Sequence, residues 1–189
     1  MLSQPLSLLV PLVLLGTTRA APGVLPVSPR AAQRCYEGEL TDLLCYNAPD
    51  SEPQSVDVDD VAHIASYLRS YGAQTKSGRL FTMPAAAAPD CGEWSVFAHG
   101  TALALAKHID GSVDSSVLFA DIATTIDGGV NATSQQRAAA LISCGASGGS
   151  LGVQVNTADP AYAAATYPAG YTPGGLLIKI VASVAQGSG

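Results

Sequence analysis

The chain contains 189 residues, of which 48% are hydrophobic and 13% are charged. It is therefore long enough to build one buried core, and its composition is unlike that of an intrinsically disordered protein. Nine lysine and arginine residues against fifteen aspartate and glutamate residues give a formal net charge of −6, which argues against a nucleic-acid-binding surface because such a surface needs a basic footprint.

The first twenty residues have the pattern of a secretory signal peptide. The apolar run Leu6–Leu15 is too short to cross a hydrocarbon layer as a helix, and the small residues up to Ala20 fit a cleavage site. Cleavage there removes Arg19, which leaves 8 basic against 15 acidic side chains and a net charge of −7. No other segment is apolar enough to span a membrane, so we expect a secreted, extracellular protein.

A proline-rich leader is expected over residues 21–34, which contain three prolines and no apolar periodicity. Removal of this leader as a pro-segment, by cleavage near Arg30 or Arg34, is an alternative. A single domain is expected over residues 35–184, followed by a flexible tail over residues 185–189.

The cysteines and one sequon agree with export. The four cysteines are spaced 10, 46 and 53 residues apart, unlike metal-binding C-x-x-C pairs, and this spacing favours two disulfides in an oxidising compartment. Three pairings are compatible with the sequence. The triplet that begins at Asn131 is the only N-glycosylation acceptor in the chain, so a glycan is expected there. The cysteines are Cys35, Cys45, Cys91 and Cys144.

The clearest predicted helix begins after Asp57 and ends at Gly72. Apolar residues recur at helical spacing from Val58 to Leu68, and Asp57 is placed to cap the first turn. Two further helices are predicted over residues 114–127 and 133–143, the second with a capping box formed by Thr133 and Gln136.

Strands are predicted over residues 79–83, 94–98, 101–107, 151–155 and 176–184, although the alanine-leucine run in 101–107 is also compatible with a helix. A short helical turn is expected at Asp159 and Pro160. Because strands and helices alternate without βαβ regularity, the fold class is predicted as α+β. We expect a two-layer sandwich of a mainly antiparallel sheet with about three helices, stabilised by two disulfides.

The glycine-rich segment CGASGG at residues 144–149 resembles the G-x-S-x-G nucleophile motif of hydrolases and, in part, the C-x-G-D-S-G-G segment of chymotrypsin-like proteases. However, all three histidines precede Ser147, whereas α/β-hydrolases place theirs after the serine, and Ala146 stands where the proteases have aspartate. We favour a loop that joins a helix to the next strand, with Ser147 and His99 as the catalytic alternative.

Glu93 next to Trp94 is a second candidate site, because tryptophan can stack on a sugar ring and raise the pKa of a neighbouring acid. Core packing is the preferred role of this tryptophan. Helix capping explains the acidic run at residues 57–60 better than a calcium site, whose D-x-D-x-D-G pattern is absent. His99 and His108 have no third ligand at suggestive spacing, so no metal and no cofactor is expected; a turn position is the default for His99 and a solvated position for His108.

A signal peptide, two expected disulfides, a small α+β domain and no complete catalytic set together resemble small secreted fungal proteins. This grouping includes effector-like and killer-toxin-like α/β sandwiches. The resemblance is one of type over residues 35–184; killer-toxin-like proteins usually carry more than four cysteines, and no functional residue is carried over.

The resemblance and the export signals imply a secreted, non-enzymatic interaction module. Its expected partner is an extracellular protein or carbohydrate, with no nucleic acid and no membrane span. The alternative is a secreted hydrolase that uses Ser147 or Glu93.

Overall fold

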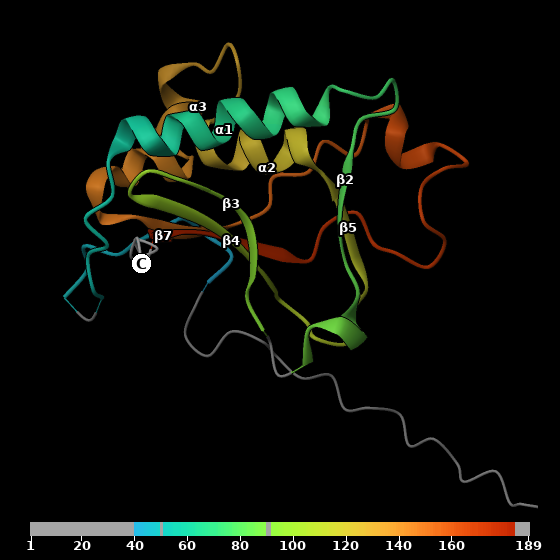
Figure 1. The fold of residues 1–189 in the computed structure, drawn as a ribbon, viewed down its shortest axis with the longest axis horizontal. Coiled ribbons are helices and arrows are strands. Elements are labelled where there is room, and N and C mark those ends of the chain that lie inside the picture. Colours follow the sequence, from blue (N-terminus) through green and yellow to red (C-terminus); the bar gives the residue numbers. More distant parts are fainter. Residues whose placement is uncertain (1–39, 50, 90–91, 184–189) are drawn as a thin grey trace, which may run out of the picture.

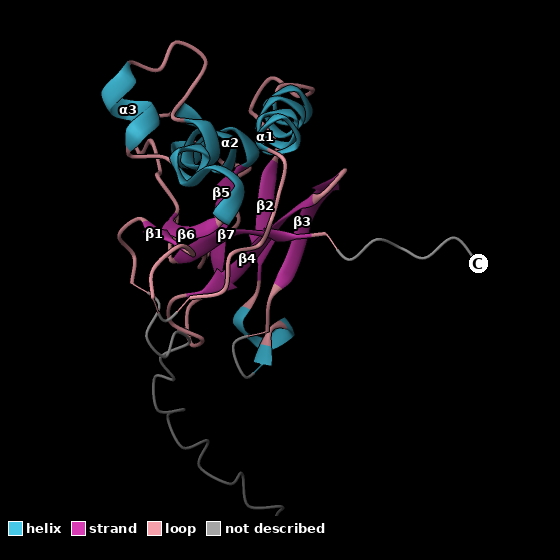
Figure 2. Ribbon diagram, turned by 90° about the vertical axis from the view of Figure 1, so that its left-hand side faces the viewer, coloured by secondary structure: helices cyan, strands magenta, loops and turns pink. Residues whose placement is uncertain are grey.

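The computed structural model describes residues 40–49, 51–89 and 92–183. They form an α+β fold in which helices cover one face of a mainly antiparallel sheet, as predicted (Figure 1; Figure 2). The signal peptide, the leader and the tail expected from the sequence lie outside the described residues.

Five strands form the main sheet in the order β1-β6-β7-β4-β3, and every neighbouring pair is antiparallel. A separate antiparallel pair joins β2 to β5. The strands are β1 (Leu44–Cys45), β2 (Leu80–Met83), β3 (Trp94–His99), β4 (Ala102–His108), β5 (Ser115–Leu118), β6 (Gly149–Gly152) and β7 (Leu176–Ala182).

Three α-helices lie on one side of this sheet, with α1 and α2 next to each other (Figure 2). Among the described residues, no helix is both long enough and apolar enough to cross a membrane. The α-helices are α1 (Val58–Gly72), α2 (Phe119–Asp127) and α3 (Ser134–Ala138), and the 3-10 helices are η1 (Ala85–Ala87), η3 (Leu141–Ser147) and η4 (Pro160–Ala163).

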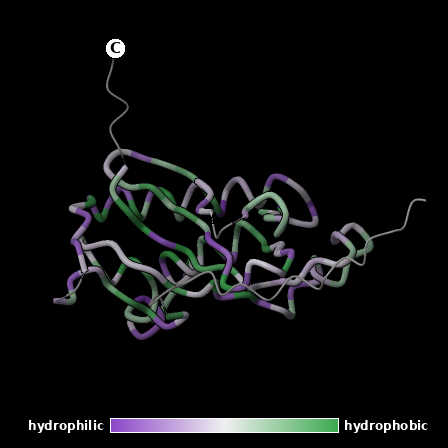
Figure 3. Tube along the Cα trace, turned by 90° about the horizontal axis from the view of Figure 1, so that it is seen from below, coloured by the Kyte–Doolittle hydropathy of each residue, from purple (hydrophilic) through white to green (hydrophobic). Residues whose placement is uncertain are grey.

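The core lies between the helices and the sheet. Every second residue of β4 from Ala102 to Ala106 is an alanine that is fully buried, and such small side chains let a helix pack close to the strand. Hydrophobic stretches accordingly run through the middle of the trace (Figure 3). The largest side chains of this core include Ile64, Leu68, Ile122, Ile126, Leu176, Ile178 and Ile180.

Two local predictions are confirmed at the helix N-termini. The Asp57 carboxylate accepts a hydrogen bond from the Asp59 N–H at 2.8 Å and caps α1. Thr133 and Gln136 form the predicted capping box of α3: the Thr133 hydroxyl oxygen accepts from the Gln136 N–H, and Gln136 Oε1 accepts from the Thr133 N–H.

Two predicted helices are shorter than expected. Residues Ser115–Leu118 form β5 instead of the first turn of a helix over 114–127, because they are fully buried and pair with β2. Here the Thr82 and Ser116 hydroxyls lie 2.9 Å apart. The helix expected over 133–143 ends at Ala138, and a 3-10 segment, η3, follows it to Ser147.

A disulfide between Cys45 and Cys144 ties β1 to η3, with a Cα–Cα distance of 5.1 Å. The expectation of disulfides is therefore confirmed for one bridge. Cys35 and Cys91 lie outside the described residues, so the second expected bridge stays a prediction.

Candidate functional site

The loop between α1 and β2, residues 73–79, forms one wall of a pocket. The Arg79 N–H donates to the Gly72 carbonyl at 3.0 Å, and the Arg79 carbonyl accepts from the Phe119 N–H at 3.0 Å, so the loop is held between the end of α1 and the start of α2. Gly78 has a φ of +75°, and a Cβ there would lie 2.7 Å from Leu118 Cδ2. This position therefore needs glycine.

The facing wall is η4. Asp159 caps it, since its Oδ1 accepts from the Ala161 N–H at 2.9 Å. The Tyr162 hydroxyl anchors the same segment: it donates to Asp121 Oδ2 at 2.5 Å and accepts from the Leu118 N–H at 2.9 Å. The wall is thereby bonded to the β5–α2 junction.

Asp121 is only 6% exposed, and this burial raises its pKa, although hydrogen bonds from the Tyr162 hydroxyl and the Asn156 N–H act in the opposite direction. Burial, followed by the bond to Asp121, also raises the pKa of Tyr162. The hydroxyl therefore stays protonated and keeps donating to the carboxylate.

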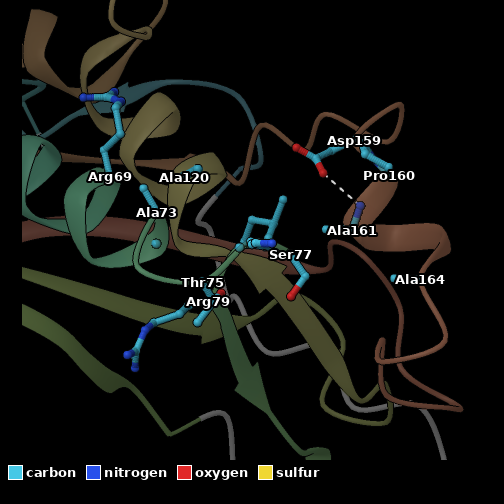
Figure 4. A pocket seen from close by; sticks show the side chains of 14 residues that line it. Arg69, Ala73, Thr75, Ser77, Arg79, Ala120, Asp159, Pro160, Ala161 and Ala164 are labelled. Carbon is cyan, nitrogen blue, oxygen red and sulfur yellow. Dashed lines mark hydrogen bonds between the residues drawn. The ribbon is translucent and has the colours of Figure 1, made fainter.

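Between these walls lies a pocket of about 660 Å³ (Figure 4). That volume is within the range of roughly 300–1,000 Å³ found for small-molecule sites. Small side chains and glycines leave this space unfilled. The lining residues of this kind are Gly72, Ala73, Thr75, Ser77, Gly78, Ala120, Pro160, Ala161 and Ala164.

Three basic side chains also line the pocket. Arg69 is paired with Asp127 at 2.7 Å, and Arg79 donates to the Tyr71 hydroxyl at 3.1 Å while lying 4.5 Å above the Tyr71 ring. Both arginine side chains extend away from the η4 wall in Figure 4. Lys76, which is exposed, has no hydrogen bond or ion pair with any other described residue.

The glycine-rich segment around Ser147 has a structural role. Its backbone holds the chain that precedes α1: the Ser147 carbonyl accepts from the Gln54 N–H at 3.0 Å, and the Ala146 carbonyl accepts from the Val56 N–H at 2.9 Å. In the described part of the chain, no hydrogen bond joins the Ser147 side chain to His99 or His108. The structure does not bring together the serine and histidine that the sequence suggested.

Glu93 is paired with a lysine. Its Oε1 accepts from Lys179 Nζ at 2.7 Å. Trp94 is half-buried and meets Phe81 edge to face, at a centroid distance of 6.5 Å. Trp94 thus packs against the core, which is the role preferred from the sequence.

His99 instead stacks on His63 of α1, with ring centroids 3.7 Å apart and an interplanar angle of 18°. Its Nε2 lies 3.8 Å from Asp60 Oδ1. The N–H and the hydroxyl of Thr101 both donate to Asp60 Oδ2, and these bonds are the main cause of a lowered Asp60 pKa. The sequence did not reveal this cluster, because its members meet only across the contact between α1 and the β3–β4 turn.

The prediction that His108 is exposed to solvent is wrong. The side chain is fully buried at the end of β4, where Nδ1 lies 3.5 Å from the Ser115 hydroxyl. This burial lowers the pKa of His108, although Asp114 and Asp110 act in the opposite direction. Because Ser115 is also fully buried, this pair is closed to any substrate.

Two remaining candidates lie on the surface. In the acidic run at residues 57–60, Asp57 caps α1 and Asp60 accepts a hydrogen bond from the Thr101 N–H. In the described ranges, no group of three or more His, Cys, Asp or Glu residues is arranged to hold a metal ion. Asn131 is exposed in the turn between α2 and α3, next to Val130 at 73% exposure. Its glycosylation stays a prediction.

Sequence reasoning missed the pocket, because its walls come from three separate segments and form no motif. No sequence signal pointed toward it: Asp121, whose bond to Tyr162 holds one wall, lies outside the apolar face of its predicted helix, and only the structure shows that it is buried.

Comparisons with protein-family models, curated proteins and solved structures give no match for this chain.

Proposed function

We propose that this protein is a secreted, non-catalytic binding protein that acts outside the cell and takes a small molecule in the pocket between the 73–79 loop and η4. The main support is the pocket itself, a volume of about 660 Å³ that small side chains leave open. Pockets of this size with a few polar groups on an apolar lining are typical ligand sites.

The walls of this pocket favour binding because they are held before a ligand arrives. Backbone hydrogen bonds fix the 73–79 loop, and the bonds of Tyr162 to Asp121 and Leu118 fix η4. A preformed site loses less conformational entropy on binding than a mobile one.

The extracellular setting is part of the same proposal. The signal peptide, the sequon at Asn131 and the Cys45–Cys144 bridge support it. We further propose that Cys35 and Cys91 form the second disulfide, and that the protein is an effector-like or toxin-like module. Loss of apparent mass on glycosidase treatment of the secreted protein would support the glycan, and an unchanged mass would contradict it.

Blocking the pocket tests the binding function. Ala164 lines the pocket, whereas its neighbour Ala163 is exposed and does not, so Ala164→Trp and Ala163→Trp form a matched pair. Each protein is incubated with a diverse set of small molecules, and the retained compounds are identified by mass spectrometry after gel filtration.

We expect wild type and Ala163→Trp to retain the same compounds, and Ala164→Trp to lose them while its near-ultraviolet circular dichroism stays native. Retention that is unaffected by Ala164→Trp, or no retention by wild type, would overturn the proposal. Chemical conversion of a retained compound would contradict the non-catalytic part.

A further inference from the structure

We infer that the ligand of this pocket is an amphipathic organic anion, with its acidic group at the 73–79 loop and its apolar body against η4. This inference rests on the proposed binding function and names the chemical class of the ligand. The support comes from how charge, hydroxyl groups and apolar surface are distributed over the two walls.

Basic residues are concentrated at the pocket although the chain as a whole is acidic. Six lysine and arginine residues lie in the described ranges, and three of them line this single cavity. The other three lie elsewhere. The pocket-lining residues are Arg69, Lys76 and Arg79, and the others are Lys107, Arg137 and Lys179.

Of the three lining cations, Lys76 is the one whose charged group makes no hydrogen bond or ion pair with another described residue. Arg69 is neutralised by Asp127, and Arg79 is held at the Tyr71 ring and hydroxyl. Lys76 lies between Thr75 and Ser77, so an ammonium and two hydroxyl donors occupy consecutive positions of one wall. Such a set of donors suits a carboxylate, sulfonate or phosphate group.

The facing wall, η4, favours an apolar group and disfavours an anion. Pro160, Ala161 and Ala164 supply apolar surface, and the Asp159 carboxylate at the edge of this wall repels an anion. An anionic ligand is therefore oriented, with its acidic group toward Lys76. A ligand with a second acidic group at the other end would be disfavoured by Asp159.

A pair of fluorescent probes tests the ligand class. Anilinonaphthalene sulfonate carries an anionic group on an apolar aromatic body, and phenylnaphthylamine has nearly the same body without the charge. Fluorescence titrations of both probes use wild type, Lys76→Gln, Lys76→Arg, Ala164→Trp and Arg137→Gln. Arg137 is exposed on α3 away from the pocket, so its substitution controls for net charge.

We expect the anionic probe to bind wild type more tightly than the neutral probe, and binding of both to be lost in Ala164→Trp. Lys76→Gln should lower the affinity for the anionic probe about three- to fivefold, which is the effect of losing an exposed charge pair. Its affinity for the neutral probe should equal that of wild type. Lys76→Arg should retain most of the affinity, and Arg137→Gln should match wild type.

The two possible failures are distinguishable. In the first, both probes bind wild type with equal affinity, Ala164→Trp blocks both, and Lys76→Gln changes the affinity of neither. The pocket is then a binding site, and the anionic class of its ligand is wrong. If Ala164→Trp leaves probe binding unchanged, the pocket itself is not the binding site and the proposed function fails with it.

Discussion

The Tyr162 hydroxyl and the Asp121 carboxylate form a buried hydrogen bond of 2.5 Å that joins η4 to the first turn of α2. The same hydroxyl accepts from the Leu118 N–H, so one oxygen atom satisfies a carboxylate and a backbone donor. Through this bond a side chain of the pocket wall is connected to the core.

Tyr162→Phe is expected to lower the free energy of unfolding by about 1–3 kcal/mol, because the Leu118 N–H loses its partner and the buried Asp121 carboxylate keeps only the longer bond from the Asn156 N–H. Chemical denaturation measures the loss. The control is Tyr67→Phe, since Tyr67 is 41% exposed and its hydroxyl makes no hydrogen bond to a described residue. A loss no larger than that of the control would contradict this role of Tyr162.

Acidification is expected to destabilise the protein through His108. Burial holds its folded-state pKa below the ordinary value of 6.5, so the fold favours the neutral imidazole. The stabilisation is complete above pH 6.5 and is lost as the pH falls from 6.5 toward the lowered folded-state pKa, because the unfolded chain binds the proton first. The slope is at most about 1.4 kcal/mol per pH unit.

His108→Gln removes this titration. Unfolding free energies measured between pH 5 and pH 8 should show a flatter dependence below 6.5 for the variant than for wild type. His63→Gln, at an exposed histidine, is the matched control. Equal slopes in wild type and His108→Gln would assign the acid sensitivity to other groups.

In the glycine-rich segment at residues 145–149, substitution of Ser147 is expected to leave the stability of the protein unchanged, whereas substitution of Gly148 is expected to lower it. Gly148 has φ 66° and ψ −174°, a conformation essentially restricted to glycine, and a Cβ there would collide with the Ile180 carbonyl oxygen. Gly148→Ala should lower the unfolding free energy by at least about 3 kcal/mol.

Gly170 provides the comparison, since it also has a positive φ, of 85°, but a methyl group added there would have no other atom within 4 Å. Gly170→Ala should lower the unfolding free energy by only about 1–2 kcal/mol, because it adds backbone strain but no steric contact. Ser147→Ala should leave stability and probe binding unchanged. Equal losses in the two glycine variants would mean that the contact with Ile180 is relieved by local movement.

Non-reducing peptide mapping of the secreted protein is expected to recover Cys45 linked to Cys144 and Cys35 linked to Cys91. The first bridge spans a sequence separation of 99 residues, and a loop of that size contributes roughly 4–5 kcal/mol in the chain-entropy description. Recovery of Cys35 or Cys91 as a free thiol would contradict the second bridge.

Much of the local structure was predictable from the sequence. The α1 helix and its Asp57 cap, and the capping box of Thr133 and Gln136, depend on residues within a few positions of one another, so the pattern contains the needed information. The α+β class was predictable because the strand and helix segments follow one another without βαβ regularity.

The three-dimensional structure decided what depends on distant segments. Ser115–Leu118 fits a helical pattern yet forms β5, because pairing with β2 outweighs local preference. His108 is buried next to Leu176, its partner on β7, which is remote from it in sequence. His99 stacks on His63 of α1, and no hydrogen bond between described residues joins it to Ser147. The pocket exists only where the loop after α1, the β5–α2 junction and η4 converge, and small residues in each segment leave a space that no single segment encodes.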